Sequence, residues 1–340
     1  MYDVCIVGGG IAGSSLAYYL APEFKVCVVE EKGLDGVGKK PCPGAVQKSW
    51  FRGFSPEDFG AVGRRVRNMR LSAGGRSLRV GFDGYVINRH RLCRGLLEAA
   101  FAEGCDWVRG KAEPSFRDGV DHVRADKKRI EANVYVDASG SSAVLRRHYL
   151  PNRRGMFVLG CMETVDGGDG SDELDIYLLN HGETGWVFPA EHSTNIGYVK
   201  AGVRGLDLGR KLRSFKREVG LDGTRMLDRG YGLIPSYRPI RLVHDNLVAI
   251  GDAGFTVNPI TCGGIGPSIT VANMLAENLG RGEDLDVFEA EYRKSLGNKF
   301  EKFYRINHVL REAWLPLWWA AGAYYGDNLL SKLLKGLLRL

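Results

Sequence analysis

The stretch Tyr2-Asp3-Val4-Cys5-Ile6-Val7-Gly8-Gly9-Gly10-Ile11-Ala12-Gly13 decides the fold. Its first half is a short apolar run that is typical of a buried parallel strand. Apolar side chains at helical spacing follow over residues 11–20, and a second apolar run covers residues 25–30. Strand, helix and strand in this order predict the start of an α/β domain with a parallel sheet.

The glycines between the first strand and the helix have the spacing Gly8-x-Gly10-x-x-Gly13. The first allows a tight turn, the second lets a pyrophosphate approach the backbone, and the third lets helix and strand pack closely. The start of the helix offers free N–H groups to phosphates, and an acid ending the second strand can accept hydrogen bonds from ribose hydroxyls. The candidate contacts to a dinucleotide are therefore Gly8, Gly10, Ile11, Ala12, Gly13, Glu30 and Glu31.

Composition excludes several classes of protein. The 340 residues suggest about two lobes, and 44% hydrophobic residues are enough for a real core. Seven cysteines without a C-x-x-C spacing argue against a disulfide framework and against a metal site. We see no secretory signal and no membrane-spanning stretch, so we expect a cytoplasmic protein. A net charge of +7 without interleaved aromatic residues favours a solvated basic face or a contact with an anionic lipid surface over nucleic-acid binding.

The middle of the chain interrupts the dinucleotide-binding pattern. Residues 67–80 alternate around two glycines like a hairpin, and further alternating segments at 174–178 and 195–199 indicate an antiparallel sheet. A buried strand returns at 246–250, and a helix follows at about 267–279. We predict a discontinuous Rossmann-type domain (1–65, 80–150 and 242–285), an antiparallel-sheet substrate domain (66–79 and 151–241) and a helical C-terminal region (286–340).

The late strand carries a second set of candidate residues. It leads into Gly251-Asp252, where a carboxylate can accept a hydroxyl of the ribityl chain of a flavin dinucleotide. Residues 258–266 then open a helix through Gly263, Gly264 and Ile265, so that backbone N–H groups and the helix N-terminus can face an isoalloxazine. A nicotinamide-only enzyme has no use for this element, so we expect FAD as the cofactor.

These motifs resemble those of the FAD-dependent group that includes p-hydroxybenzoate hydroxylase and the geranylgeranyl reductases. The resemblance implies that Arg89, in Asn88-Arg89-His90-Arg91, approaches the FAD pyrophosphate, and that Gly140 belongs to a second fingerprint near the adenosine. It extends over most of the chain.

Two stretches are similar to those of the geranylgeranyl reductases in particular. Pro41-Cys42-Pro43-Gly44-Ala45 resembles their proline–cysteine–glycine loop beside the flavin, which implies that Cys42, Gly44 and Ala45 contact the cofactor. Gly185-Trp186-Val187-Phe188-Pro189 resembles their cavity motif, which implies a substrate-lining role for Trp186, Phe188 and Pro189. Thr184 and Val199 stand where the family has a tyrosine and a glycine.

The resemblance implies reduction of isolated C=C bonds in geranylgeranyl chains, as in archaeal-type membrane lipid biosynthesis. Hydride from the flavin and a proton to the neighbouring carbon are both required, and Cys42 is our candidate proton donor. A redox pair of Cys42 with Cys262 is a further hypothesis. The expected partners are a prenylated lipid or prenyl diphosphate and an electron donor, either NAD(P)H or a ferredoxin.

The tail from Leu329 to Leu340 alternates leucines with basic residues, and three tryptophans precede it at 314, 318 and 319. This pattern is typical either of a peripheral contact with an anionic membrane face or of a helix that packs on the protein. Three other functions remain open: an FAD- and NAD(P)H-dependent aromatic monooxygenase, a tryptophan-halogenase relative, and a non-catalytic carrier of lipid or flavin.

Overall fold

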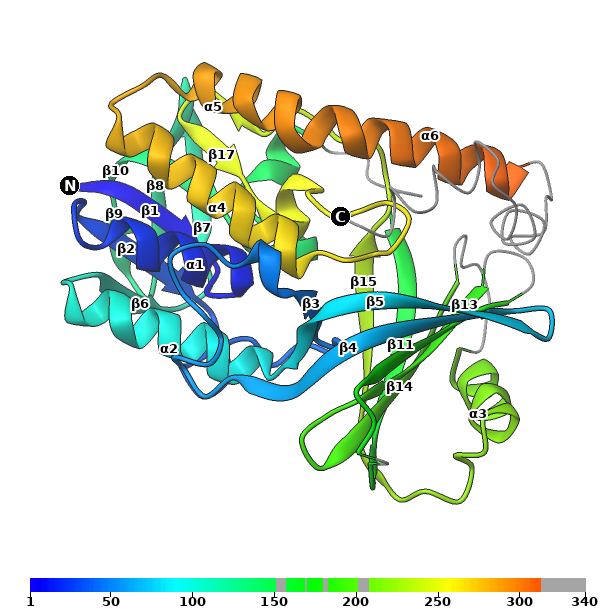
Figure 1. The fold of residues 1–340 in the computed structure, drawn as a ribbon. Helices are drawn as coiled ribbons and strands as arrows, with labels where there is room; N and C mark the ends of the chain where they lie inside the picture. The colour runs from blue at the N-terminus through cyan, green and yellow to red at the C-terminus, as the bar shows by residue number, and fades with distance from the viewer. Residues whose placement is uncertain (151–156, 169, 180–182, 201–207, 313–340) are drawn as a thin grey trace.

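The computed structural model describes residues 1–150, 157–168, 170–179, 183–200 and 208–312, the last six of these as backbone only. Figure 1 shows a parallel sheet covered by helices on the left and a long twisted sheet on the right, which carries α3 (Leu208–Glu218) on its outer side. The predicted α/β class with a sheet-rich insertion is confirmed.

A six-stranded sheet forms the first part, in the order β16-β17-β10-β1-β2-β6. All neighbours are parallel except β16 and β17. The strands are β1 (Tyr2–Val7), β2 (Val26–Glu30), β6 (Asp106–Arg109), β10 (Ala132–Asp137), β16 (Val243–His244) and β17 (Leu247–Ala249). Because Asp137 of β10 lies opposite Ala249 of β17, the predicted late strand completes the sheet that the N-terminus begins.

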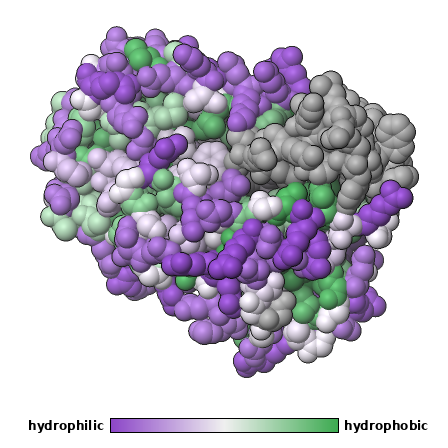
Figure 2. All heavy atoms as spheres, viewed as in Figure 1, coloured by the Kyte–Doolittle hydropathy of each residue, from purple (hydrophilic) through white to green (hydrophobic). Residues whose placement is uncertain are grey.

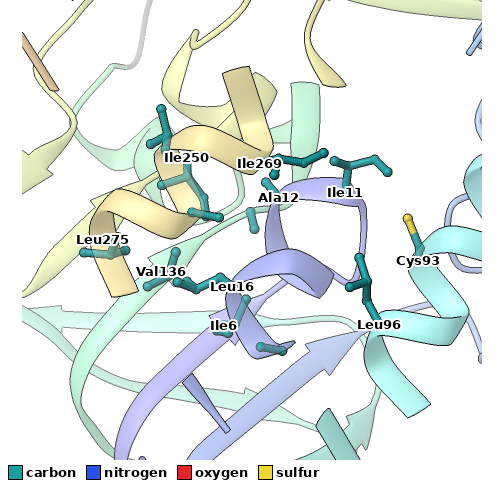
Figure 3. Packing of buried hydrophobic residues seen from close by; sticks show 14 of the residues in the cluster. Ile6, Ile11, Ala12, Leu16, Cys93, Leu96, Val136, Ile250, Ile269 and Leu275 are labelled. Atoms are coloured by element: carbon teal, nitrogen blue, oxygen red, sulfur yellow. The ribbon is translucent and has the colours of Figure 1, made fainter. Parts of the chain in front are cut away.

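Three helices cover one face of this sheet: α1 (Ile11–Leu20), α2 (Arg89–Ala102) and α4 (Ile265–Gly280). Alternate strand residues, such as Ile6 and Val136, pack against Leu16, Ile269 and their neighbours from the helices, as Figure 3 shows. Full burial of such side chains contributes roughly 1.5–3 kcal/mol each, so this layer is the main core of the molecule.

The opposite face is covered by a small antiparallel sheet that the sequence analysis did not predict. Its strands are β7 (Glu113–Arg117), β8 (Gly119–Ala125) and β9 (Lys128–Ile130). Cys5, Val7 and Tyr135 of the parallel sheet meet Val123 and Ile130 there in a second core.

An eight-stranded sheet forms the second part, in the order β15-β11-β14-β13-β12-β4-β5-β3. It is antiparallel except for the pair β12–β4, which is parallel, so the predicted antiparallel sheet is mixed at this one place. The expected hairpin is also longer, because β4 and β5 extend it at both ends. The strands are β3 (Ala45–Gln47), β4 (Val62–Ala73), β5 (Arg76–Ile87), β11 (Phe157–Asp166), β12 (Glu173–Leu178), β13 (Glu183–Pro189), β14 (Ser193–Lys200) and β15 (Met226–Pro235).

The two faces of this large sheet have different partners. Cys161, Ile196 and Tyr198 face α3 and pack on its Leu212 and Phe215. The other face contributes a separate apolar cluster, formed by Val66, Met69, Val86, Leu174 and Phe188 together with partly buried Trp186. Strand alternation therefore separates the α3 side from a second apolar side.

The C-terminal region is helical as far as the structure describes it. Its elements are α5 (Leu285–Tyr292), the π-helix η6 (Arg293–Gly297) and α6 (Asn298–Glu312), which runs across the top of the molecule in Figure 1. The expected amphipathic tail and the tryptophans before it lie outside the described residues. In the part that is described, no helix is both long and apolar enough to cross a membrane. The division into three domains stays a prediction.

Candidate flavin site

The turn between β1 and α1 has the backbone that its glycines predict. Gly8 has a φ of +107°, and a Cβ there would lie 2.5 Å from the carbonyl oxygen of Ala138. A Cβ on Gly13 would clash with the carbonyl of Gly8, whereas a Cβ on Gly10 would meet nothing within 4 Å. The helix then begins at Ile11 without a side-chain cap, so its first N–H groups remain available to an anion. Gly8 and Gly13 are thus needed for close packing, and Gly10 keeps a space open.

Glu30 lies beside this turn at the end of β2. Its carboxylate accepts the backbone N–H of Gly9 at 2.7 Å and that of Lys32 at 2.9 Å. Each oxygen keeps a second lone pair for a ribose hydroxyl. Glu31 is exposed at the surface next to it.

The late motif lies against the early one. Gly251, with a φ of +62°, opens the 3₁₀ helix η5 (Gly251–Gly254), and a Cβ there would lie 2.9 Å from the Cβ of Ala12. Gly140 begins another 3₁₀ turn, η2 (Gly140–Ser142), which contacts η5 and leaves open space around its own α-carbon. The structure therefore brings the two predicted fingerprints to one end of the parallel sheet.

Asp252 has a partner that the sequence analysis did not predict. The Nζ atom of Lys40 lies 2.6 Å from Oδ2 of Asp252, and it also lies 3.5 Å from the carbonyl oxygen of Leu233 in β15. Both side chains are partly exposed, 34% for Lys40 and 21% for Asp252. This ion pair connects the Pro41–Ala45 loop, the late motif and the large sheet. Lys40 is only two residues before Cys42, and that proximity was the one available signal.

Arg89 begins α2 and lies among the same groups. Burial disfavours its charge, but Cys42, Cys93 and Asp252 nearby outweigh that effect, so the pKa of the Arg89 guanidinium lies above its ordinary value. Its Nε atom is buried and has no hydrogen-bond partner among the described residues. A buried donor of this kind suits an anionic ligand.

The second flavin loop leads into α4. Gly263 and Gly264 precede Ile265, and α4, like α1, begins without a side-chain cap. A Cβ on Gly264 would lie 3.5 Å from Oδ1 of Asp252, which places this loop beside the ion pair. Neither Cys262 nor Cys42 forms a disulfide among the described residues, and their redox pairing stays a prediction.

The Pro41–Ala45 loop lies between the parallel-sheet part and the large sheet. A Cβ on Gly230 of β15 would clash with the ring of Pro41, and Nδ2 of Asn195 in β14 lies 3.5 Å from the carbonyl oxygen of Pro43. Gly44, with a φ of +80°, packs its α-carbon on the carbonyl of Ile87 before β3 begins at Ala45. Gly230 was not predicted, and its signal was the pair of glycines at positions 230 and 232 of β15.

Two of the predicted lining residues, Trp186 and Phe188, lie on the same face of the large sheet, whereas Pro189 at the end of β13 alternates to the opposite face. In β13, Trp186 is opposite Gly197 and Phe188 is opposite Asn195. A Cβ on Gly197 would clash with the ring of Trp186, so the glycine allows the indole to lie flat over β14. Trp186 is partly buried and its Nε1 has no partner in the described chain, whereas Phe188 and Pro189 are buried. The apolar face thus adjoins the strand that contacts the Cys42 loop.

The arrangement fits a dinucleotide with a redox-active ring. The open space at Gly10, the two uncapped helix starts and the unpaired Nε of Arg89 supply sites for phosphates and for an electron-rich ring. Among the described residues no three His, Cys, Asp or Glu side chains gather in a way that could hold a metal ion.

Comparisons with known proteins give the same reading. The family described as FAD dependent oxidoreductase matches residues 3–40. A digeranylgeranylglycerophospholipid reductase of Methanoculleus marisnigri is 28% identical, with 90% of this chain and 85% of that protein covered. The protein of the same name from Sulfolobus acidocaldarius is 26% identical, with 79% of this chain and 66% of that protein covered. A geranylgeranyl diphosphate reductase of Rhodobacter capsulatus is 27% identical, with 88% and 82% covered.

Solved structures share the fold. A geranylgeranyl bacteriochlorophyll reductase-like protein from Thermoplasma acidophilum superposes with a TM-score of 0.77 at 20% identity, covering 92% of this chain and 87% of that one. A probable FAD-dependent monooxygenase from Pseudomonas aeruginosa superposes with a TM-score of 0.73 at 21% identity, covering 96% and 100%. The resemblance predicted from the motifs is confirmed. The chain is an FAD-dependent oxidoreductase that is similar over most of its length to the geranylgeranyl reductases.

Proposed function

We propose that this protein saturates isolated C=C bonds of geranylgeranyl chains, in the manner its relatives' names describe. The observation that carries the proposal is the position of the Pro41–Ala45 loop. On one side of the loop, Lys40 forms an ion pair with Asp252 of the dinucleotide site. On the other side, Pro41 packs on Gly230 and Pro43 contacts Asn195, both in the large sheet. The loop therefore joins a redox site to an apolar face.

FAD, when bound, supplies the hydride for the alkene carbon. Gly10, Glu30, Arg89, Gly140, Gly251 and Asp252 would hold its dinucleotide part, and Gly8 and Gly13 would shape the turn that receives it. Gly44, Ala45, Gly263, Gly264 and Ile265 would contact its ring. Ile11, Ala12 and Glu31 complete the set. These assignments rest on the open space at Gly10, on the unpaired Nε of Arg89 and on the meeting of the two fingerprints.

The remaining groups act on the substrate. Trp186 and Phe188 form an apolar wall that excludes water from the alkene, which has no polar group to orient it, and Pro189 ends the strand that carries them. Cys42 delivers the proton from its Sγ to the carbon next to the one that receives the hydride. Its thiol lies in the loop between the dinucleotide site and the large sheet, and it packs against the main core.

The substrate that fits this face is a prenylated lipid or a prenyl diphosphate, and reduced FAD is regenerated by NAD(P)H or a ferredoxin. We place the enzyme in the cytoplasm, with an anionic membrane face as the surface from which it takes its substrate. Figure 2 shows a largely hydrophilic surface on this face, with apolar residues both over the parallel-sheet part and over the large sheet.

The test is anaerobic saturation of a geranylgeranyl lipid by dithionite-reduced, FAD-loaded protein, followed by mass spectrometry. Each saturated bond adds two hydrogens to the product. We expect Cys42→Ala to keep its FAD and to lose most of the turnover, about 100-fold for loss of a positioned acid. The matched control is Cys105→Ala, which removes a thiol buried near β6.

Full turnover by Cys42→Ala would remove the thiol from the mechanism. Absence of any saturated product, together with oxygen consumption stimulated by an aromatic substrate, would replace the reductase with a monooxygenase.

A further inference from the structure

A basic cavity of about 440 Å³ lies at the β16 edge of the parallel sheet, apart from the residues assigned to the flavin. Its wall includes four arginines from three segments of the chain: Arg146, Arg238 with Arg241, and Arg293. Among the described residues that line it, Glu301 is the single carboxylate. Arg146 opens the 3₁₀ turn η3 (Arg146–His148), Arg238 and Arg241 lie just before β16, and Arg293 begins η6.

Two of these arginines are neutralised by neighbouring acids. Arg241 lies 2.9 Å from Asp286, and Arg293 lies 2.9 Å from Glu289. The carboxylate of Glu301 is itself paired with Arg305 at 3.1 Å. In the part of the chain that the structure describes, Arg146 and Arg238 have no carboxylate within 4.0 Å, so the cavity keeps about two uncompensated charges.

Arg146 is the unusual member, because it is only 1% exposed. One guanidinium nitrogen donates to the carbonyl of Arg241, but Nε and Nη1 are buried and have no partner among the described residues. Asp137, the buried acid that most favours the charge of Arg146, accepts the backbone N–H groups of Leu145 and Arg146 instead. A buried guanidinium with two unused donors is costly without a ligand that accepts from it.

The charge of this guanidinium persists at neutral pH. Burial lowers the pKa of Arg146 to about 10, against the opposing effect of Asp137 and Glu289. Burial, together with Arg146 and Arg241, also lowers the pKa of His244, whose Nε2 lies 3.5 Å from a nitrogen of Arg146. His244 is therefore neutral there and adds no further charge. Its ring is fixed by stacking on Tyr149 at 4.4 Å between centroids.

We propose that this cavity binds the phosphate or diphosphate group of a small anionic ligand, held by the guanidinium groups of Arg146 and Arg238. Guanidinium donors match the oxygens of a phosphate in pairs, and two free charges match a doubly charged group. The volume is that of a small-molecule site and leaves room for the organic part to which the phosphate is attached. Two sources share this chemistry: the phosphate end of the isoprenoid substrate, which rests on the proposed function, and the phosphates of a nicotinamide dinucleotide.

The probe is inorganic pyrophosphate, titrated calorimetrically into the FAD-loaded protein. We expect one molecule per chain, with affinity reduced about tenfold or more in Arg238→Gln. Arg146→Gln should bind no pyrophosphate. Because substitution of this buried residue carries a risk of misfolding, Arg238→Glu serves as a second test variant. Arg281→Gln is the matched control, since Arg281 is an exposed arginine of the same region paired with Glu283 and Glu291.

No saturable binding, or binding by Arg238→Gln and Arg238→Glu equal to that of the unchanged protein, would overturn the site. If glycerol phosphate displaces pyrophosphate, the ligand is a lipid headgroup, and if NADPH displaces it, the ligand is the nucleotide. If neither displaces it, the proposal that the cavity binds a small phosphate ester is rejected. Dithionite-driven alkene saturation needs no nucleotide. If the protein saturates the alkene but does not bind pyrophosphate, the site is therefore rejected and the proposed function stands. If it binds pyrophosphate but does not saturate the alkene, the proposed function is rejected and the site stands.

Discussion

Gly8 and Gly10 stand two residues apart in one turn, yet a methyl group meets different surroundings at each. At Gly8 it would lie 2.5 Å from the carbonyl oxygen of Ala138, on a backbone with a φ of +107°. At Gly10 it would meet no protein atom within 4 Å, and the backbone, with a φ of −68°, accepts any residue. The first glycine serves the fold, and the second keeps space for a ligand.

This difference predicts opposite phenotypes. Gly10→Ala should change the unfolding free energy of the apoprotein by less than about 1 kcal/mol, as expected for a helix N-cap. It should weaken FAD binding about tenfold or more, because the methyl group takes the place of a phosphate oxygen. Gly8→Ala should instead destabilise the apoprotein by roughly 1–3 kcal/mol. Urea unfolding and flavin fluorescence titration measure the two effects, and a Gly10→Ala protein that binds FAD normally would contradict the assignment.

At the scale of elements, the large sheet depends on glycines in its strands. Trp186 of β13 lies over Gly197 of β14, and Gly230 of β15 receives Pro41. These strand glycines lack the side chains that would separate the sheet from the indole and from the Cys42 loop.

Gly197→Ala should therefore displace the ring of Trp186 and destabilise the protein by roughly 1–3 kcal/mol, the usual cost of overpacking. Tryptophan fluorescence and urea unfolding report the change. Gly81→Ala is the matched control, because Gly81 lies in β5 of the same sheet and a Cβ there meets nothing within 4 Å. Equal effects of the two substitutions would disprove a specific contact with the indole.

The attachment of α3 to the large sheet is the second feature at this scale. Glu163 of β11 is 2% exposed and lies 2.9 Å from Lys216 of α3 and 2.5 Å from Arg229 of β15. Burial alone raises the pKa of this carboxyl, but hydrogen bonds from Lys216 and Arg229 outweigh it, so the pKa of Glu163 lies below its usual value. A carboxylate with a lowered pKa stabilises the fold above the unfolded-state value, and this contribution is lost as the pH falls.

Glu163→Gln should lower the unfolding free energy by about 3 kcal/mol at pH 7, since it leaves two cations facing each other under α3. The difference from the unchanged protein should shrink as the pH falls below the ordinary glutamate pKa of about 4.3, because Glu163 of the unfolded chain then takes up a proton before that of the folded chain. Chemical unfolding over this pH range provides the measurement. Glu191→Gln, which breaks the exposed pair with Arg91, should cost at most about 1 kcal/mol. A loss independent of pH would argue against the ionised pair.

At the scale of the whole molecule, the cofactor site has no single location in the sequence. Its residues come from the first turn, from the Cys42 loop, from the start of α2 and from the segment between β17 and α4. A ligand that contacts all of these segments connects parts that are otherwise joined only by packing.

FAD should therefore stabilise the whole protein. At a free concentration one hundred times its dissociation constant, the expected gain is about 2.7 kcal/mol. Thermal unfolding at rising FAD concentration tests this, with Gly10→Ala as the variant that should gain less at equal FAD. A melting temperature that does not depend on FAD would contradict the site.

Much of this architecture could be predicted from local patterns. The strand–glycine–helix units at both ends of the dinucleotide part have strong periodicity and distinctive turns, so their elements were placed within a few residues. The small sheet β7–β9 was missed because β8 buries its residues without regular alternation. Strand β15 was missed because it is an edge strand, rich in glycine and largely exposed.

The site was predicted in part for the same reason. Glycines and acids that follow strands have a fixed spacing and can be recognised, whereas the pairing of Lys40 with Asp252 depends on folding across 212 positions. The unpaired donors of Arg146 have no sequence signal, because an arginine after a turn is usually solvated.

The pairing of β10 with β17 has a consequence for biosynthesis. While the ribosome makes the intervening insertion, which takes on the order of 5–20 s, the nascent chain carries a parallel sheet with one edge uncovered. The helix α4 emerges later still, so the apolar face it covers stays bare until translation is well advanced. A stalled or shortened polypeptide would therefore be a substrate for chaperones and proteases rather than a smaller working enzyme.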